Sequence, residues 1–352
     1  MFTDTRWANV EKKFKNRRHT DPQTSSYSSE SRHSDIIDDF CNSTDTMSPS
    51  LSEGESSNIG GGEYFLPSNS DKEIERLQMQ HFLMRCIWKE NFSSPIKEDF
   101  IKGGVKKDVY HMPPSSKNRC GSGVWITDLA TEFTASTFIG VDGDEARARI
   151  QIELPNAAYL HHDLLDELPF PENTFDFVNQ RFFTMASEEK WRNYVLPEII
   201  RVTKTGGYME FMEMGNWQEM GKVTKRMTKA YDDYMETRGV YRLNPSSVEK
   251  TLRSTNLIKN IKCDSRISPF WGGQASRLIC RNQIEKIAVI RSDMCKFLNI
   301  SEREFNEMIE AMHEEVRIHK TFSISYRYVE ERLGESIFLT HKRPPTDSLP
   351  IK

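Results

Sequence analysis

Short apolar runs alternate with amphipathic stretches through the middle of the chain. The β-rich runs that predict strands are 136–142, 157–161, 174–180 and 207–213. Apolar side chains at helical spacing predict a helix over 188–204, which Gly206 and Gly207 are expected to end. Strands that alternate with helices predict a parallel sheet with right-handed crossovers, whose ligands bind at the carboxyl ends of the strands.

The pattern continues on both sides of this core. Ser70 and Glu73 have the spacing of a capping box, and the apolar positions behind them predict an amphipathic helix over 71–90. Further elements are expected at 218–257 and 282–318 (helical) and at 258–269 and 321–329 (strands). The prediction is therefore an α/β domain that carries an N-terminal helix and a helical insertion.

The apolar positions also set the expected domain boundaries. Residues 1–62 are rich in Ser, Asp and Gly and carry few apolar side chains, so burial cannot offset their ordering entropy and a disordered tail is expected. The expected domain, 63–342, is followed by a tail over 343–352 and divides into an N-terminal helix region (63–100), a core (101–215), a helical insertion with a strand (216–320) and a closing strand (321–342).

Charge and composition narrow the classes of partner. Of 48 Lys and Arg and 52 Asp and Glu, residues 1–70 hold 7 and 11, which leaves 41 of each beyond them. A neutral globular part has no overall field for nucleic acid, so nucleic acid is not indicated as a partner. A basic cluster between Lys12 and Arg18 has two interpretations, a nuclear-import or nucleic-acid patch and a solvated part of the tail.

The expected location is intracellular, either cytoplasmic or nuclear. No apolar run approaches the roughly 18 residues that a membrane span needs, and the first residues lack the apolar core of a secretory signal. The six cysteines are scattered without a C-x-x-C pair, which predicts free thiols and no metal site.

A glycine turn and two acidic residues form the candidate ligand site. Gly121-Ser122-Gly123 precedes a helical stretch over 124–133, and glycines let a backbone approach a ligand beside free helix amides. Asp142 ends a predicted strand 19 residues after Gly123, where a carboxylate accepts hydrogen bonds from ribose hydroxyls. The alternative for Asp142 is an ordinary turn aspartate. Asp163 follows the next strand, where a carboxylate can accept from an adenine amino group.

The chain resembles the class I S-adenosylmethionine-dependent methyltransferases, in particular a fungal branch that includes methyltransferase-like regulators of secondary metabolism. The resemblance spans about residues 63–340 and is carried by 64–67, 76–81, 168–182, 201–210 and 271–273. It implies a doubly wound, mostly parallel seven-stranded sheet with helices on both faces, and S-adenosyl-L-methionine as the cofactor.

The resemblance also implies roles for the residues of the candidate site. Gly121, Ser122 and Gly123 would line the methionine and ribose part of the cofactor, and Asp142 would hold the ribose.

Two further groups follow in the same way. Asp163 with Leu164 would hold the adenine, while Asn179, Gln180 and Arg181 would border the methyl-transfer pocket.

One segment departs from the family pattern, in which an apolar strand ends in an acidic residue just before the glycine turn. Here Lys117 takes the place of the acid and Arg119 that of the first glycine. Pro113-Pro114 cannot lie in a central strand, so the first strand is either displaced to 105–112 or lost. The segment is either a genuine degenerate cofactor site or an artefact of a mispredicted exon boundary.

The predicted activity is methyl transfer to an unidentified acceptor, which is a small molecule or a protein. No catalytic residue is assigned; the candidate bases are His161, His162, Glu210 and Glu213. The alternative is a catalytically silent methyltransferase-like protein that acts through regulatory partners or as a scaffold. A nicotinamide-dependent enzyme is a third reading, but the turn lacks the last glycine of G-x-G-x-x-G.

Overall fold

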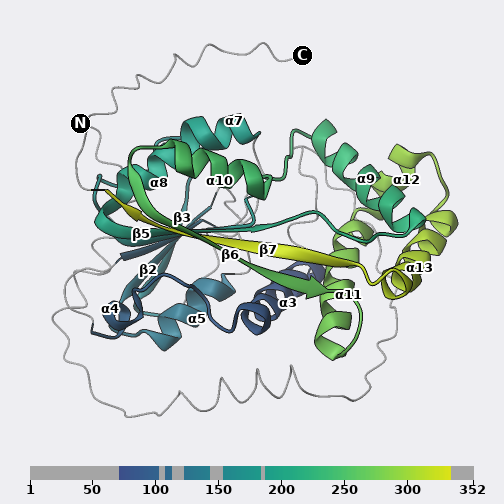
Figure 1. Ribbon diagram of the computed structural model, residues 1–352, viewed down its shortest axis with the longest axis horizontal. Coiled ribbons are helices and arrows are strands. Elements are labelled where there is room, and N and C mark those ends of the chain that lie inside the picture. The colour runs from purple at the N-terminus through teal and green to yellow at the C-terminus, as the bar shows by residue number, and fades with distance from the viewer. Residues whose placement is uncertain (1–70, 103–107, 113–122, 143–153, 184–186, 334–352) are drawn as a thin grey trace.

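A computed structural model describes residues 71–102, 108–112, 123–142, 154–183 and 187–333 (Figure 1). The expected tails at 1–62 and 343–352 lie outside the described residues. So do Gly121 and Ser122, as well as Pro113, Pro114, Lys117 and Arg119 of the unusual segment.

Seven strands form one sheet in the order β3-β2-β1-β4-β5-β7-β6. They are β1 (Asp108–Met112), β2 (Thr137–Asp142), β3 (Ala157–His161), β4 (Phe175–Arg181), β5 (Thr203–Met214), β6 (Ile258–Pro269) and β7 (Phe322–Arg332). Neighbouring strands from β3 to β5 are parallel, and β7 runs antiparallel to β5 and β6. The predicted α/β class and mostly parallel pairing are confirmed.

The order in which successive strands are added to the sheet reverses at β1. From this strand the chain proceeds through β2 and β3 on one side and through β4 and β5 on the other. The carboxyl ends of β1 and β4 therefore flank the topological switch point, which is where open α/β sheets bind their ligands. Because β1 occupies Asp108–Met112, the first strand is displaced rather than lost, as one of the two sequence alternatives had it.

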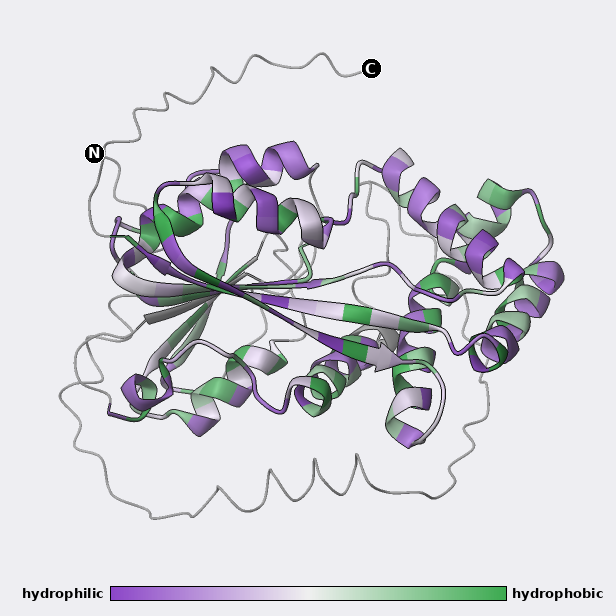
Figure 2. Cartoon of the chain, in the orientation of Figure 1, coloured by the Kyte–Doolittle hydropathy of each residue, from purple (hydrophilic) through white to green (hydrophobic). Residues whose placement is uncertain are grey.

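Helices cover both faces of the sheet (Figure 1). One face carries α3 (Asp71–Trp88), α4 (Lys97–Lys102) and α5 (Val124–Glu132), and the other carries α7 (Glu188–Lys190), α8 (Leu196–Val202) and α10 (Pro245–Ser254). Figure 2 shows hydrophobic residues on both strands and helices, and β6 at the edge of the sheet also carries hydrophilic stretches. A separate apolar core lies on each face, built around Trp191 on one and Phe100 on the other.

The helix predicted over 188–204 is wrong in two respects. A π-helical turn, η2 (Trp191–Val195), separates α7 from α8, and the helix ends at Val202 rather than at the glycines. Thr203 already pairs with Phe175 of β4, and Gly206 lies inside β5 with a φ of 75°. Pairing with a buried strand outweighs the local helical preference of these residues.

The helical insertion is a small bundle with its own core. It consists of α9 (Lys222–Thr237), α11 (Gln274–Ala288), α12 (Arg291–Leu298) and α13 (Glu302–Ile318), which pack with Leu83 of α3. The stretch predicted as helical over 218–257 is broken between α9 and α10, and α11 begins before the predicted 282. The carboxylate of Glu315 on α13 accepts from the first amides of α9, those of Val223 and Thr224, at 3.0 and 2.7 Å.

Two sequence expectations concern cysteines and membrane spans. Cys263, Cys280 and Cys295 are free, as predicted, but Cys86 is disulfide-bonded, which corrects the expectation of a free thiol there. Within the ranges that the structure describes, no helix has the length and apolar character of a membrane span.

Candidate functional site

Gly123 starts α5 at the switch point. It is the N-cap of the helix and has a φ of 70°, a conformation that favours glycine. A Cβ at this position would lie 3.3 Å from the Tyr159 hydroxyl oxygen, so a larger residue would also crowd the ring. Both constraints favour glycine at the N-terminus of α5.

The two predicted acidic residues lie at the same edge. Asp142 ends β2 and pairs in register with His161, the last residue of β3. Asp163 follows two residues later and is exposed; its Oδ1 accepts from the amide of Leu165 at 3.0 Å. Leu164 between them is 3% exposed and belongs to the core, so it offers a ligand only its backbone.

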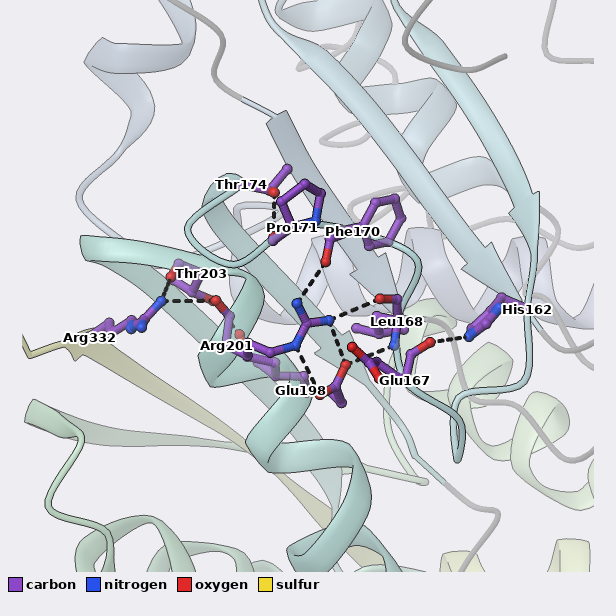
Figure 3. Close-up of polar contacts among 11 residues, drawn as sticks. His162, Glu167, Leu168, Phe170, Pro171, Thr174, Glu198, Arg201, Thr203 and Arg332 are labelled. Atoms are coloured by element: carbon purple, nitrogen blue, oxygen red, sulfur yellow. Dashed lines mark hydrogen bonds and ion pairs between the residues drawn. The ribbon is translucent and has the colours of Figure 1, made fainter. Parts of the chain in front are cut away.

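The apolar run after Asp163 forms a loop that α8 holds in place (Figure 3). The guanidinium of Arg201 donates to the carbonyl oxygens of Phe170 and Leu168 at 2.7 and 2.9 Å. Glu198 accepts from Arg201 at 2.7 and 3.0 Å and from the amide of Leu168 at 2.8 Å. Arg201 and Glu198 of α8 therefore anchor this run, 168–176, which connects the loop of Asp163 to β4.

Both ends of the loop are fastened as well. At its start, the His162 Nε2 bonds the carbonyl oxygen of Glu167 at 2.8 Å. At its end, Arg332 of β7 donates to Asn173 Oδ1 at 3.0 Å. Arg332 also donates to the carbonyl oxygen of Thr203 (Figure 3). The imidazole of His162 is thus engaged in the loop, which weakens its candidacy as a base.

Replacing Arg201 by methionine is expected to lower the free energy of unfolding by about 2 kcal/mol, because two buried carbonyl groups lose a charged donor. Denaturant unfolding of the full chain measures the change. Arg253→Met on α10 removes an arginine whose side chain, among the described residues, bonds Glu249 one turn away, and it is the control. Equal effects of the two substitutions would contradict an anchoring role for Arg201.

The three predicted residues at the end of β4 point into the protein. Asn179, Gln180 and Arg181 are at most 6% exposed, and Gln180 Oε1 accepts from the indole of Trp191 at 3.0 Å. It is the next residue, Phe182, with a φ of 53°, that reaches the cavity described below.

Arg181 joins a buried polar network that fastens α3 to α5. Its guanidinium lies 3.4 Å from His81 Nδ1, and His81 Nε2 lies 3.1 Å from Asp128 Oδ2. Burial lowers the pKa of His81 to about 4, so the ring is neutral near pH 7 and donates to Asp128 while accepting from Arg181. Asp128 also accepts from Arg85 and Asn91, at 2.5 and 2.9 Å.

A cavity of about 460 Å³ opens at the carboxyl ends of β4 and β5. Helices α3, α9 and α11 and the loop between α9 and α10 form its walls. Its lining residues include Arg76, Gln80, Phe182, Met214, Asn216, Tyr231, Asp232, Tyr241, Arg242, Gln283, Lys286 and Tyr326. Most of them come from the insertion and from α3, so the cavity lies between the sheet and the helical insertion.

Two glutamates of β5 were candidate bases, and their surroundings differ. Glu210 accepts from the amides of Ser93 and Ser94 and pairs with Arg327, so it is held structurally. Glu213 is buried and accepts from the amide of Phe183 at 2.9 Å. Burial raises the pKa of Glu213 to about 8. Glu213 is therefore protonated near pH 7 and is not a ready base.

The described residues contain no group of three or more metal-binding side chains. Sequence reasoning missed the polar cavity residues of α3 and α11. Arg76 with Gln80 and Gln283 with Lys286 are one turn apart on their helices, a spacing that any surface helix shows. Arg76 and Gln80 belong to the stretch 76–81 that carries the resemblance, but no role was assigned to them, and no local signal distinguishes Gln283 and Lys286 from solvated positions.

Comparisons with known proteins point to one chemistry. A family described as a methyltransferase domain matches residues 119–207, which contain Gly123, Asp142, Asp163 and the end of β4. Methyltransferase str3 from Strobilurus tenacellus is 32% identical over 90 residues, which are 25% of this chain and 31% of that protein. The match therefore spans about a third of the relative's length. These matches support a methyltransferase domain with S-adenosylmethionine as its cofactor.

Two solved structures match this chain at TM-scores below 0.5. Phosphoethanolamine N-methyltransferase 2 from Haemonchus contortus, solved with S-adenosylmethionine, gives a TM-score of 0.41 at 17% identity over 76% of this chain and 58% of that chain. A geranyl diphosphate methyltransferase in complex with the same cofactor gives 0.39 at 11% identity over 74% and 87%.

Proposed function

We propose that the chain is an S-adenosylmethionine-dependent methyltransferase whose acceptor occupies the cavity beside the switch point. The observation that carries this proposal is the position of the matched segment: residues 119–207 contain the predicted cofactor residues, and their strands end at the edge where the cavity opens. The bound cofactor supplies a methyl group already activated by its sulfonium.

The residues present fit such a cofactor at the described positions. Gly123 precedes the first amides of α5, Asp142 ends β2, and Asp163 follows the adjacent parallel strand β3 and is exposed. In this proposal Gly121, Ser122 and Gly123 line the methionine and ribose part of the cofactor, and Asp142 holds the ribose hydroxyls.

The adenine would rest against Asp163 and the backbone of Leu164. Asn179, Gln180 and Arg181 would act from below the transfer site, since they are buried and Phe182 forms the surface above them. Their part is to hold the end of β4 and α3 in register.

Orientation is the main contribution that this chain's residues make to the reaction. A cavity that holds the acceptor in line with a methyl group can supply about 7–11 kcal/mol of the barrier through proximity alone. No base is assigned. The acceptor is a small molecule or a protein segment. A chain that binds no cofactor would instead act through regulatory partners.

Calorimetric titration of S-adenosylmethionine into the full chain tests the proposal. We expect saturable binding near the micromolar range, about −8 kcal/mol, that disappears in an Asp142→Ala and Asp163→Ala double variant. Asp166→Ala removes an exposed carboxylate from the same loop and serves as the control. No detectable heat with folded protein would reject the enzyme and favour the silent regulatory or scaffold protein.

A further inference from the structure

Strand β6 forms one edge of the sheet. Within the described part of the chain it pairs with β7 on one side, and no strand lies beyond it on the other (Figure 1). Residues 262–267 of β6 are all exposed, whereas the following Ser268 is buried. An exposed edge of this kind presents backbone amides and carbonyl groups with which another extended strand can pair.

The alternation of backbone directions shows which residues of β6 face outward. The amide of Phe270 donates at 3.0 Å to a carbonyl oxygen just before β7, so the backbone of this residue faces β7. In an antiparallel ladder every second residue pairs in this way. The backbone groups of Cys263, Ser265 and Ile267 therefore face the open edge. Pro269 belongs to the same outward series, which suits a residue that has no amide hydrogen to donate.

Side chains of the two neighbouring residues bond the outward backbone groups of Ser265. Asp264 Oδ1 accepts from the Ser265 amide at 2.8 Å, and Arg266 Nη1 donates to the Ser265 carbonyl oxygen at 2.9 Å. The same two side chains are bonded to each other at 2.6 Å, and both are about half exposed. These bonds stand where the bonds to a neighbouring strand would form. Exposed ion pairs contribute little stability, so a second strand can displace them.

The residues around Ser265 are complementary to a second copy of β6. A twofold axis through Ser265 places Asp264 opposite Arg266 of the second copy, on one face of the strand. On the other face Cys263 lies opposite Ile267 of the second copy, and Ile267 is 64% exposed in the single chain. An axis through Asp264 or through Arg266 would instead put like charges opposite each other, which is destabilising.

We propose that two copies of this chain pair through their β6 strands, edge to edge and antiparallel, about an axis at Ser265. The Asp264 and Arg266 side chains exchange their bonds within one chain for ion pairs between the copies. This exchange releases the amide and the carbonyl group of Ser265, which bond the same groups of the second copy. The two sheets then form one continuous sheet. The pairing depends on neither the cofactor nor the acceptor cavity.

Disulfide trapping with the full chain tests this arrangement. Ser265→Cys, made in a Cys263→Ser background, places one thiol at the proposed axis. Paired residues in an antiparallel ladder have Cα atoms about 5.5 Å apart, which is within the reach of a disulfide. We expect mild oxidation to give a covalent dimer about tenfold faster than for Ser292→Cys in the same background, because pairing raises the local thiol concentration. Ser292 is an exposed residue on α12 and is the matched control.

Charge reversal distinguishes specific pairing from chance collision. Asp264→Arg puts like charges opposite each other and should abolish the faster trapping, and adding Arg266→Asp should restore it. Thermal unfolding verifies that each variant is folded. Equal trapping rates for Ser265→Cys and Ser292→Cys, or a faster rate that Asp264→Arg leaves unchanged, would overturn the proposal.

Sedimentation velocity of the unmodified chain gives an independent measurement. We expect a dimer whose fraction rises with protein concentration and which Ile267→Lys removes, since this change puts a charge on the exposed apolar surface. A chain that stays monomeric at about 0.1 mM, a concentration that populates even weak complexes, would contradict the pairing. A dimer that Ile267→Lys leaves intact would contradict it as well, because another surface would then hold the copies together.

Discussion

Replacing Arg327 by methionine is expected to lower the free energy of unfolding by about 3–5 kcal/mol, because it leaves Glu210 as a buried charge without its cation. Arg327 on β7 is 2% exposed and Glu210 on β5 is 1% exposed, and their closest atoms are 3.2 Å apart. The guanidinium also donates to Ser93 Oγ at 2.8 Å and lies 4.3 Å from the Trp88 ring centroid.

Denaturant unfolding at pH 7 measures this loss, and Arg266→Met is the matched control. Arg266 lies on the same side of the sheet, 5.0 Å from the Trp88 ring centroid, but its side chain is 45% exposed. A loss below about 1 kcal/mol for Arg327→Met, typical of exposed pairs, would show that the pair contributes little. Glu210→Gln in the Arg327→Met background should recover part of the loss, since the remaining side chain is neutral.

Glu213→Gln is expected to raise stability at pH 8 and to remove a pH dependence. Burial raises the pKa of Glu213 to about 8 from an ordinary 4.5, so the folded protein holds a proton that the unfolded chain has released between these values. Stability that this group contributes at low pH is lost as pH rises, by about 1.4 kcal/mol per pH unit. Glutamine keeps the shape and the bond from the Phe183 amide without titrating.

Unfolding free energies measured at about pH 6.5, 7.25 and 8 give the dependence of stability on pH. These values are evenly spaced in the upper part of the range between the ordinary and the raised pKa of Glu213. The range avoids His81, whose pKa is lowered to about 4, so that its stability contribution is lost only as pH falls below about 6.5. Glu310→Gln on the exposed side of α13 is the control. Parallel stability curves for the wild type and Glu213→Gln would mean that Glu213 is ionised in the folded protein.

Regular elements with a clear apolar period were predictable from the sequence. The strands at 157–161 and 258–269 were placed at their observed bounds, and the helix at 71–90 ends two residues earlier than predicted. The same reasoning put Asp142 and Asp163 at the ends of adjacent strands. These positions follow from the alternation of apolar and polar residues and from the turn residues within one segment. The sequence of that segment is therefore enough to predict them.

Where the local secondary-structure preference of a segment disagreed with its pairing to another strand, the pairing determined the structure. Thr203 directly follows a helix, yet it begins β5 because it pairs with Phe175 of β4. Residues 204–207, with their two glycines, lie in the irregularity before Tyr208 pairs with Phe177. The π-helical turn at Trp191–Val195 coincides with the bond from Trp191 to Gln180 on the neighbouring strand. No hydrophobic periodicity in the sequence predicts either feature.

The sequence by itself determined the α/β class and the order of the elements along the chain, and it predicted the edge of the sheet where we propose the cofactor site. Only the tertiary structure decided what the side chains there do. Arg181 meets His81 across 100 positions and Arg327 meets Glu210 across more than 100. Arg201 proved to be an anchor for its loop, and Gln283 proved to face a cavity. Burial and partner choice arise from segments distant in the chain, and the spacing of residues within one segment carries no record of them.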